Sequence, residues 1–126
     1  MNAHAFASNA YQAHARTLKT PRDIEYAILS RVTAGLQSAR DETGPTAFPA
    51  LAAAVVENNR LWTAFAVDLV HPENRFPQQL RAQLIYLAEF VAQHSDKVLN
   101  GTAEADILID VNLSVMRGLS GKVDVT

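Results

Sequence analysis

The sequence predicts an all-α protein, a small single-domain helical bundle of about five helices. Between its prolines and glycines, apolar residues recur three and four positions apart, which is the spacing of one face of an α-helix. No segment shows the run of alternating β-branched residues that is typical of a strand. Of the 126 residues, 48% are hydrophobic and 19% are charged, which is typical of one folded globular domain.

The first predicted helix covers residues 3–17 and is rich in alanine. Phe6, Ala10 and Tyr11 lie close to one side of it. Residues 1–19 are predicted to form a helical arm, for which two roles stay open. Its aromatic side chains pack on the bundle, or they fold onto a partner.

The second helix is predicted over residues 21–42. Proline is favoured at the first helical position, and Thr20 followed by Asp23 resembles a capping box. The third helix is predicted from about residue 49 to residue 70. Its apolar stripe contains Leu51, Val55, Asn58, Trp62, Phe65 and Leu69.

The fourth helix is predicted over residues 77–100, and Gly101 ends it. One face of this helix carries Leu80, Leu84, Leu87, Val91, His94 and Val98. The fifth helix is predicted to be capped by Thr102, and its apolar residues cover about two thirds of a helical wheel. Such a helix is either central in its bundle or keeps one face for a partner. Residues 120–126 are predicted to be a frayed tail.

The composition argues against several classes of function. The 11 basic and 13 acidic residues are scattered, so direct binding of nucleic acid is not expected. There is no cysteine, which excludes disulfides, zinc-thiolate sites and thiol nucleophiles. No apolar run is long enough to cross a membrane, and the N-terminus lacks the pattern of a signal peptide. These observations predict a soluble protein of the cytoplasm.

Catalytic and metal-binding patterns are also missing from the sequence. None of the four histidines has a histidine or carboxylate at the i, i+4 spacing of a convincing metal pair. Asp106 and Asp110 are four positions apart, but a solvated helix face explains them better than a magnesium site. His94 is interpreted as a half-buried or C-terminal histidine rather than a ligand or base. We therefore expect no enzyme activity, no metal site and no cofactor.

The segment "NNRLWTAF", residues 58–65, combines polar residues with the only tryptophan. Asn58 lies in the middle of an apolar stripe, and Asn112 lies inside the apolar arc of the fifth helix. A buried amide needs several hydrogen-bond partners, so these two are predicted to form a structural polar tie between helices. A role in partner binding is the alternative. Trp62, Phe65 and Leu61 are predicted core anchors.

Arg60 points to the opposite side of the same helix, near Val56 and Val67. An arginine among small apolar residues is typical of a recognition surface. An ordinary solvent face, with the arginine stem lying over apolar neighbours, accounts for the pattern equally well. The partner-binding hypothesis names these three residues together with Tyr11 and Met116.

Five fragments together resemble the FlaF family of flagellar biosynthesis regulators. They are "AY" at 10–11, "TPRDIE" at 20–25, "NNRLWTAF" at 58–65, "ENRFPQQLR" at 73–81 and "IDVNLSVMRGL" at 109–119. Most of the resemblance rests on the asparagine-arginine-leucine-tryptophan core and on the later I-D-x-N-x(5)-G-L pattern. Asn59 departs from the family pattern, in which a basic residue is expected.

The resemblance implies a cytoplasmic, non-enzymatic factor that promotes flagellin synthesis or export and acts opposite the translation regulator FlbT. The mechanism we infer is a secretion chaperone, in which a helical bundle covers the amphipathic terminal helices of flagellin before assembly. The alternative is an adaptor that acts mainly by binding FlbT, without direct flagellin chaperoning. The sequence leaves the oligomeric state open.

Overall fold

The computed structural model describes residues 21–119, which form four α-helices and no strand. The helices are α2 (Pro21–Arg40), α3 (Ala47–Val70), α4 (Gln78–Leu99) and α5 (Asp106–Leu119). The predicted all-α class is therefore confirmed. The predicted first helix at residues 3–17 and the tail at residues 120–126 lie outside the described residues.

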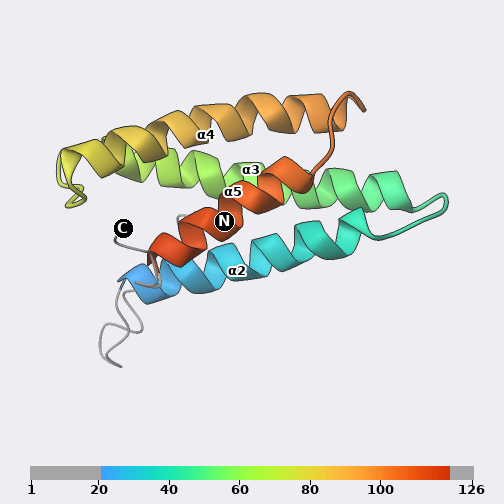
Figure 1. Cartoon of the computed structure of the whole chain (residues 1–126), viewed down its shortest axis with the longest axis horizontal. Coiled ribbons are helices and arrows are strands. Elements are labelled where there is room, and N and C mark those ends of the chain that lie inside the picture. The colour runs from blue at the N-terminus through green and yellow to red at the C-terminus, as the bar shows by residue number, and fades with distance from the viewer. Residues whose placement is uncertain (1–20, 120–126) are drawn as a thin grey trace.

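The four helices form a bundle in which α3 packs against both α2 and α4 (Figure 1). Helix α5 packs against α2 and meets α4 over a short stretch only. No Cα atoms of α3 and α5 come within 8 Å of each other, so these two helices lie diagonally across the core. Contacts between α3 and α5 therefore depend on long side chains that reach across the bundle axis.

Helix α3 begins at Ala47, slightly before the predicted start at residue 49. Pro49 is thus accommodated in the first turn, where its missing N–H has no intrahelical partner to lose. The polypeptide enters α3 through Gly44, whose φ of 90° lies in the left-handed region that glycine adopts at low cost.

The boundary between α4 and α5 differs from the prediction in one respect. Thr102 does not cap α5: its backbone N–H and its Oγ1 both donate to the carbonyl of Lys97, at 2.9 and 3.1 Å. The N–H of Gly101 donates to Val98 O at 3.0 Å, and Gly101 has a φ of 76°. This is a Schellman motif that closes the end of α4. Helix α5 consequently begins four residues beyond Thr102, at Asp106.

The core follows the predicted stripes over most of the bundle. Its fully buried apolar residues include Leu36 of α2, Val55 and Leu69 of α3, Val91 of α4 and Leu108 of α5. One residue of the apolar stripe predicted for α4 is not buried. Leu80 is 40% exposed, whereas Leu84, Val91 and Val98 are buried. None of the helices within residues 21–119 is long and apolar enough to cross a membrane.

Candidate functional site

Asn112 of α5 is the centre of a buried hydrogen-bond network that joins three helices. Its Oδ1 accepts from Trp62 Nε1 at 2.8 Å. Its Nδ2 donates to Asn58 Oδ1 at 2.7 Å and to Thr33 Oγ1 at 3.1 Å. Thr33 Oγ1 in turn donates to the carbonyl of Leu29, one helical turn earlier in α2. Asn58 and Asn112 are thus hydrogen-bonded to each other, as a tie between α3 and α5.

All four polar side chains of this network are at most 2% exposed. A hydrogen bond in such surroundings competes with no water, and removing one member leaves its partners buried and unpaired. The network links α3 and α5 directly, although no Cα atoms of these two helices come within 8 Å of each other. Its role in this geometry is to set the relative position of α2, α3 and α5.

Of the three predicted core anchors, Trp62 belongs to this network. Trp62 is almost fully buried, whereas Phe65 and Leu61 are half-buried and pack against the core. The rings of Trp62 and Phe65 are 5.7 Å apart between centroids and inclined at 58°, a favourable arrangement for aromatic pairs.

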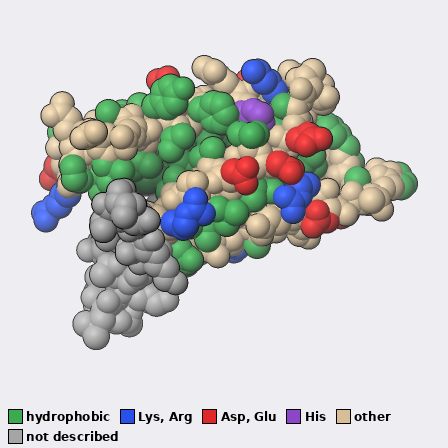
Figure 2. Space-filling view, viewed as in Figure 1, with side chains coloured by type: hydrophobic (Ala, Val, Ile, Leu, Met, Phe, Trp, Pro, Cys, Tyr) green, Lys and Arg blue, Asp and Glu red, His purple; other side chains and the backbone are tan. Residues whose placement is uncertain are grey.

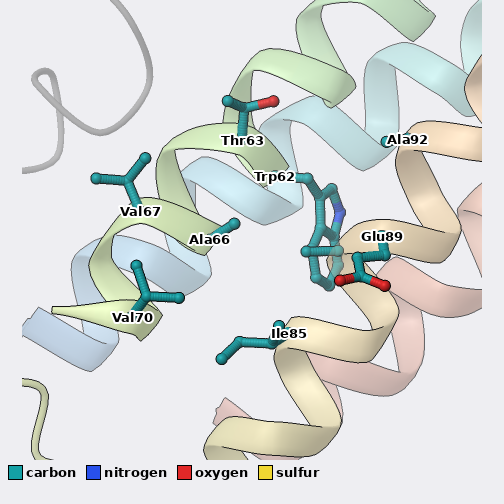
Figure 3. A pocket seen from close by; sticks show the side chains of 9 residues that line it. Trp62, Thr63, Ala66, Val67, Val70, Ile85, Glu89 and Ala92 are labelled. Atoms are coloured by element: carbon teal, nitrogen blue, oxygen red, sulfur yellow. The ribbon is translucent and has the colours of Figure 1, made fainter.

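An open groove lies between α3 and α4 (Figure 3). Small side chains of both helices, among them Ala66, Ala88 and Ala92, leave this space unfilled. The edge of the Trp62 side chain and Ile85 line its inner part. The volume is ≈ 400 Å³, and the only charged residue in its lining is Glu89 of α4.

A second depression, of ≈ 290 Å³, continues this groove along α3. The two share Thr63 and Val67 in their linings, so they form one surface, which we call the α3/α4 groove. The second part is lined by Val56, Asn59, Arg60 and Leu99, among others. Three of the partner-binding residues named from the sequence, Val56, Arg60 and Val67, are thus brought together.

The groove exposes more apolar surface than a solvated helix face requires. Val56, Val67 and Val70 of α3 are 40%, 60% and 64% exposed. Isolated exposed valines are ordinary on a protein surface, but three along one groove are typical of a contact surface.

Arg60 is placed to interact with a molecule in the groove. Its side chain is 64% exposed, and its Nη1 lies 3.9 Å from Glu57 Oε2 on the preceding helical turn. Such a surface pair is worth little, so the guanidinium can turn toward a carboxylate of a ligand at small cost.

The two remaining residues of the partner-binding hypothesis are not part of this groove. Met116 is half-buried on α5 and packs against the core. Tyr11 lies outside the described residues.

Sequence reasoning missed Thr33 and the α4 wall of the groove. Thr33 could have been suspected from its place beside Val32 and one turn before Leu36, inside the apolar arc of α2. The α4 wall could have been found from Ile85 and Ala92, which are seven positions apart and therefore lie on one face.

The candidate metal and acid–base residues take ordinary structural roles. Asp106 Oδ1 lies 3.9 Å from Arg40 Nη1, and Asp110 is exposed. His94 Nε2 is 2.9 Å from the carbonyl of Glu104, and its ring stacks on Phe90 with centroids 5.6 Å apart. Among residues 21–119, no group of three or more histidine, aspartate or glutamate side chains could hold a metal ion.

Comparison with known proteins identifies the family of this chain and no individual relative. No significant match to the chain was found among curated proteins or among solved structures. The family model described as flagellar protein FlaF matches residues 7–119. That match includes all four helices, the Asn58–Trp62–Asn112 network and the groove beside it. The chain therefore belongs to the FlaF family of flagellar proteins.

Proposed function

We propose that this flagellar protein is a non-enzymatic, cytoplasmic chaperone that binds the terminal helices of flagellin. By covering them it promotes flagellin synthesis and export, and it acts opposite the translation regulator FlbT. The observation that carries the proposal is the α3/α4 groove, which combines exposed valines with Arg60 on the surface of the bundle.

The dimensions of the groove suit an amphipathic helix. From Val56 to Val70 the exposed apolar residues of α3 extend over 14 helical positions, or about 21 Å at 1.5 Å per residue. That is about four turns, roughly twice the two turns over which an amphipathic helix presents one set of anchors at i, i+3, i+4 and i+7. The terminal helices of unassembled flagellin have unpaired apolar faces, which such a groove would cover.

The charges of the groove give the bound helix a preferred direction. Arg60 lines the part of the groove that contains Val56, and Glu89 lines the part that contains Ile85. A helix with an acidic residue near Arg60 and a basic residue near Glu89 would be favoured over the reverse orientation. The charges would therefore contribute selectivity, while the valines would contribute most of the buried apolar area.

The test is a pull-down with full-length flagellin and with flagellin lacking its terminal helices. The proposal expects recovery of the full-length protein and loss of the truncated one. Equal recovery of both would rule out binding through the terminal helices. Gel filtration of the purified protein with flagellin or with FlbT provides the comparison for the adaptor alternative. A complex with FlbT and none with flagellin would replace the chaperone by the adaptor.

A further inference from the structure

The bundle is open on one side, next to the N-terminal half of α4. Leu80 lies on the same stripe as Leu84 and Val91, yet it is 40% exposed, while the other two are at most 6% exposed. The neighbours that cover Leu84 and Val91 therefore do not extend over the first turn of α4.

The cause is the divergence of α4 and α5. They meet near the connection between them, where His94 Nε2 contacts the carbonyl of Glu104. From there the two helices separate toward the end of the bundle at which α2 begins (Figure 1). Met116, on the last turns of α5, is half-buried.

The surface left uncovered is apolar and lacks charge. Ala82, Gln83, Tyr86 and Leu87 line an open depression on α4, and Tyr86 is 69% exposed. Figure 2 shows hydrophobic side chains gathered over α4 and over the space between α4 and α5. We call the surface formed by Leu80, Tyr86 and Leu87 of α4 and Met116 of α5 the open side.

We propose that residues 3–17 of this chain dock as a helix on the open side and complete the bundle. The chain enters α2 at Pro21, at the end of the bundle where α4 begins and α5 ends (Figure 1). A segment immediately before Pro21 therefore starts next to the open side. Residues 18–20 supply a connection of the short length that is usual between antiparallel helices of bundles.

The size and chemistry of this segment match the surface. Fifteen helical residues extend about 22 Å, which spans the part of α4 from Gln78 to beyond Phe90. Residues 3–17 contain no acidic residue, and Arg16 is their only lysine or arginine. The spacing of Phe6, Ala10 and Tyr11 would place them close to one side of such a helix, where they would provide apolar area for the open side.

Covalent attachment favours this occupant over a second copy of the chain. A short tether holds the segment at an effective concentration in the millimolar range, far above that of a free chain at ordinary protein concentrations. The docked helix would lie on the face of α4 that points away from the α3/α4 groove. The inference is therefore independent of the proposed function, and each can fail without the other.

Crosslinking tests the proposal, and the natural chain has no cysteine that would interfere. Ala10→Cys is combined with Gln83→Cys, which lines the depression beside Tyr86 and Leu87, and the full-length protein is treated with a short bis-maleimide reagent. Two matched pairs combine Ala10→Cys with Thr63→Cys in the α3/α4 groove or with Ser38→Cys on α2. All three partner positions are exposed, so the helices should form in each variant, and circular dichroism confirms this.

The expected result is an intramolecular crosslink for the pair at residues 10 and 83 and a much lower yield for both control pairs. Equal yields in all pairs would mean that the segment samples the surface without docking, which overturns the proposal. A higher yield with residue 63 would place the segment in the α3/α4 groove instead. Crosslinked dimers would show that the open side is covered by a second copy.

Hydrogen–deuterium exchange provides a second test, in which the full-length protein is compared with a deletion variant. Deleting residues 1–17 should raise deuterium uptake in residues 78–90 and leave the uptake of residues 50–62 unchanged. Unchanged uptake in residues 78–90 would contradict docking on the open side.

Discussion

Asn112 shows how one side chain can hold a small helical bundle in register. Both of its amide hydrogens and its oxygen are used, by Asn58, Thr33 and Trp62. Each bond reaches a different residue of α2 or α3, so no other position on α5 would satisfy the same three partners. A leucine in its place would fill the volume but leave the indole N–H and the Asn58 amide without partners.

Replacing Asn112 by alanine is expected to destabilise the protein by about 2–4 kcal/mol, because several buried polar groups lose their partner together and a cavity forms. Asn58→Ala should cost less, about 1–3 kcal/mol, because the network loses one bond to Asn112. Urea unfolding followed by Trp62 fluorescence measures both values.

Asn100→Ala is the matched control for these substitutions, since Asn100 is exposed at the end of α4. It should change stability by less than about 0.5 kcal/mol. A smaller loss for Asn112→Ala than for Asn58→Ala would show that Asn112 is not the centre of the network.

Val67 is the residue whose substitution best separates binding from folding. It is 60% exposed in the α3/α4 groove, so Val67→Asp should leave the thermal midpoint nearly unchanged. Binding of full-length flagellin should fall by a factor of ten or more, because a carboxylate would be buried against an apolar helix face, at a cost of roughly 2 kcal/mol or more. Isothermal titration calorimetry measures the change.

Ala34→Asp places the same charge on the exposed face of α2, away from the groove, and should leave flagellin affinity unchanged. Equal effects of the two substitutions would indicate a response to net charge rather than to the groove.

Arg60→Ala should weaken flagellin binding and leave stability within about 0.5 kcal/mol, because its pair with Glu57 is a surface ion pair. Calorimetric binding and a thermal melt measure the two effects. Arg75→Ala is the control, since Arg75 is exposed in the loop before α4 and does not line the groove. A large loss of stability in Arg60→Ala would contradict an exposed contact.

At the scale of the elements, the helix ends decide how the chain reverses direction. The turn between α4 and α5 depends on Gly101, with a φ of 76°, and on the two bonds from Thr102 to Lys97 O. Because Thr102 is used for the end of α4, α5 starts at Asp106, whose negative charge in the first turn is favourable to the helix dipole.

Two glycines allow opposite predictions for the same substitution. Gly101→Ala should destabilise the protein by about 1–2 kcal/mol, because a side chain is disfavoured at positive φ. Gly35→Ala lies inside α2, where an added Cβ meets no atom within 4 Å, and should stabilise the protein by about 0.5–1 kcal/mol. Thermal unfolding of the two variants measures the difference, and a shift of equal sign in both would contradict the assignment.

For the whole molecule, α3 is the structural centre. It packs against α2 and α4 along its length and reaches α5 through Trp62 and Asn58. Helix α5 has one extensive neighbour, α2, together with the hydrogen bonds of Asn112. The α3/α4 groove and the open side lie on different sides of α4, so the molecule offers two separate apolar surfaces.

This arrangement predicts an order of local stability. Backbone amides of α3 between Val55 and Trp62 should show the slowest hydrogen exchange, and those in the last turn of α5 the fastest among the helices. In Asn112→Ala the exchange of α5 should increase more than that of α4. A uniform increase over all four helices would indicate that the bundle opens only as a unit.

The spacing of apolar residues was enough to predict helices α2 to α5 within a few residues, because a helix in water must bury one face. The same periodicity placed Asn58, Trp62 and Asn112 inward and Arg60 outward. The capping role predicted for Thr102 was wrong, because a threonine after a glycine can bind the carbonyls behind it as well as the amides ahead of it. Periodicity itself was insufficient in one place. It failed at Leu80, because periodicity shows which face is apolar and does not show which neighbour covers it.

The sequence by itself therefore determined the all-α class, the inward faces of the helices and, through recurring fragments, membership of the FlaF family. Only the tertiary structure decided that Asn112 joins Thr33, Asn58 and Trp62, and that Val56, Arg60 and Val67 share a groove with α4. It also decided that α4 and α5 diverge and leave one side open. The reason is physical: local patterns fix which face of a helix is apolar, whereas the packing of several helices fixes which faces meet.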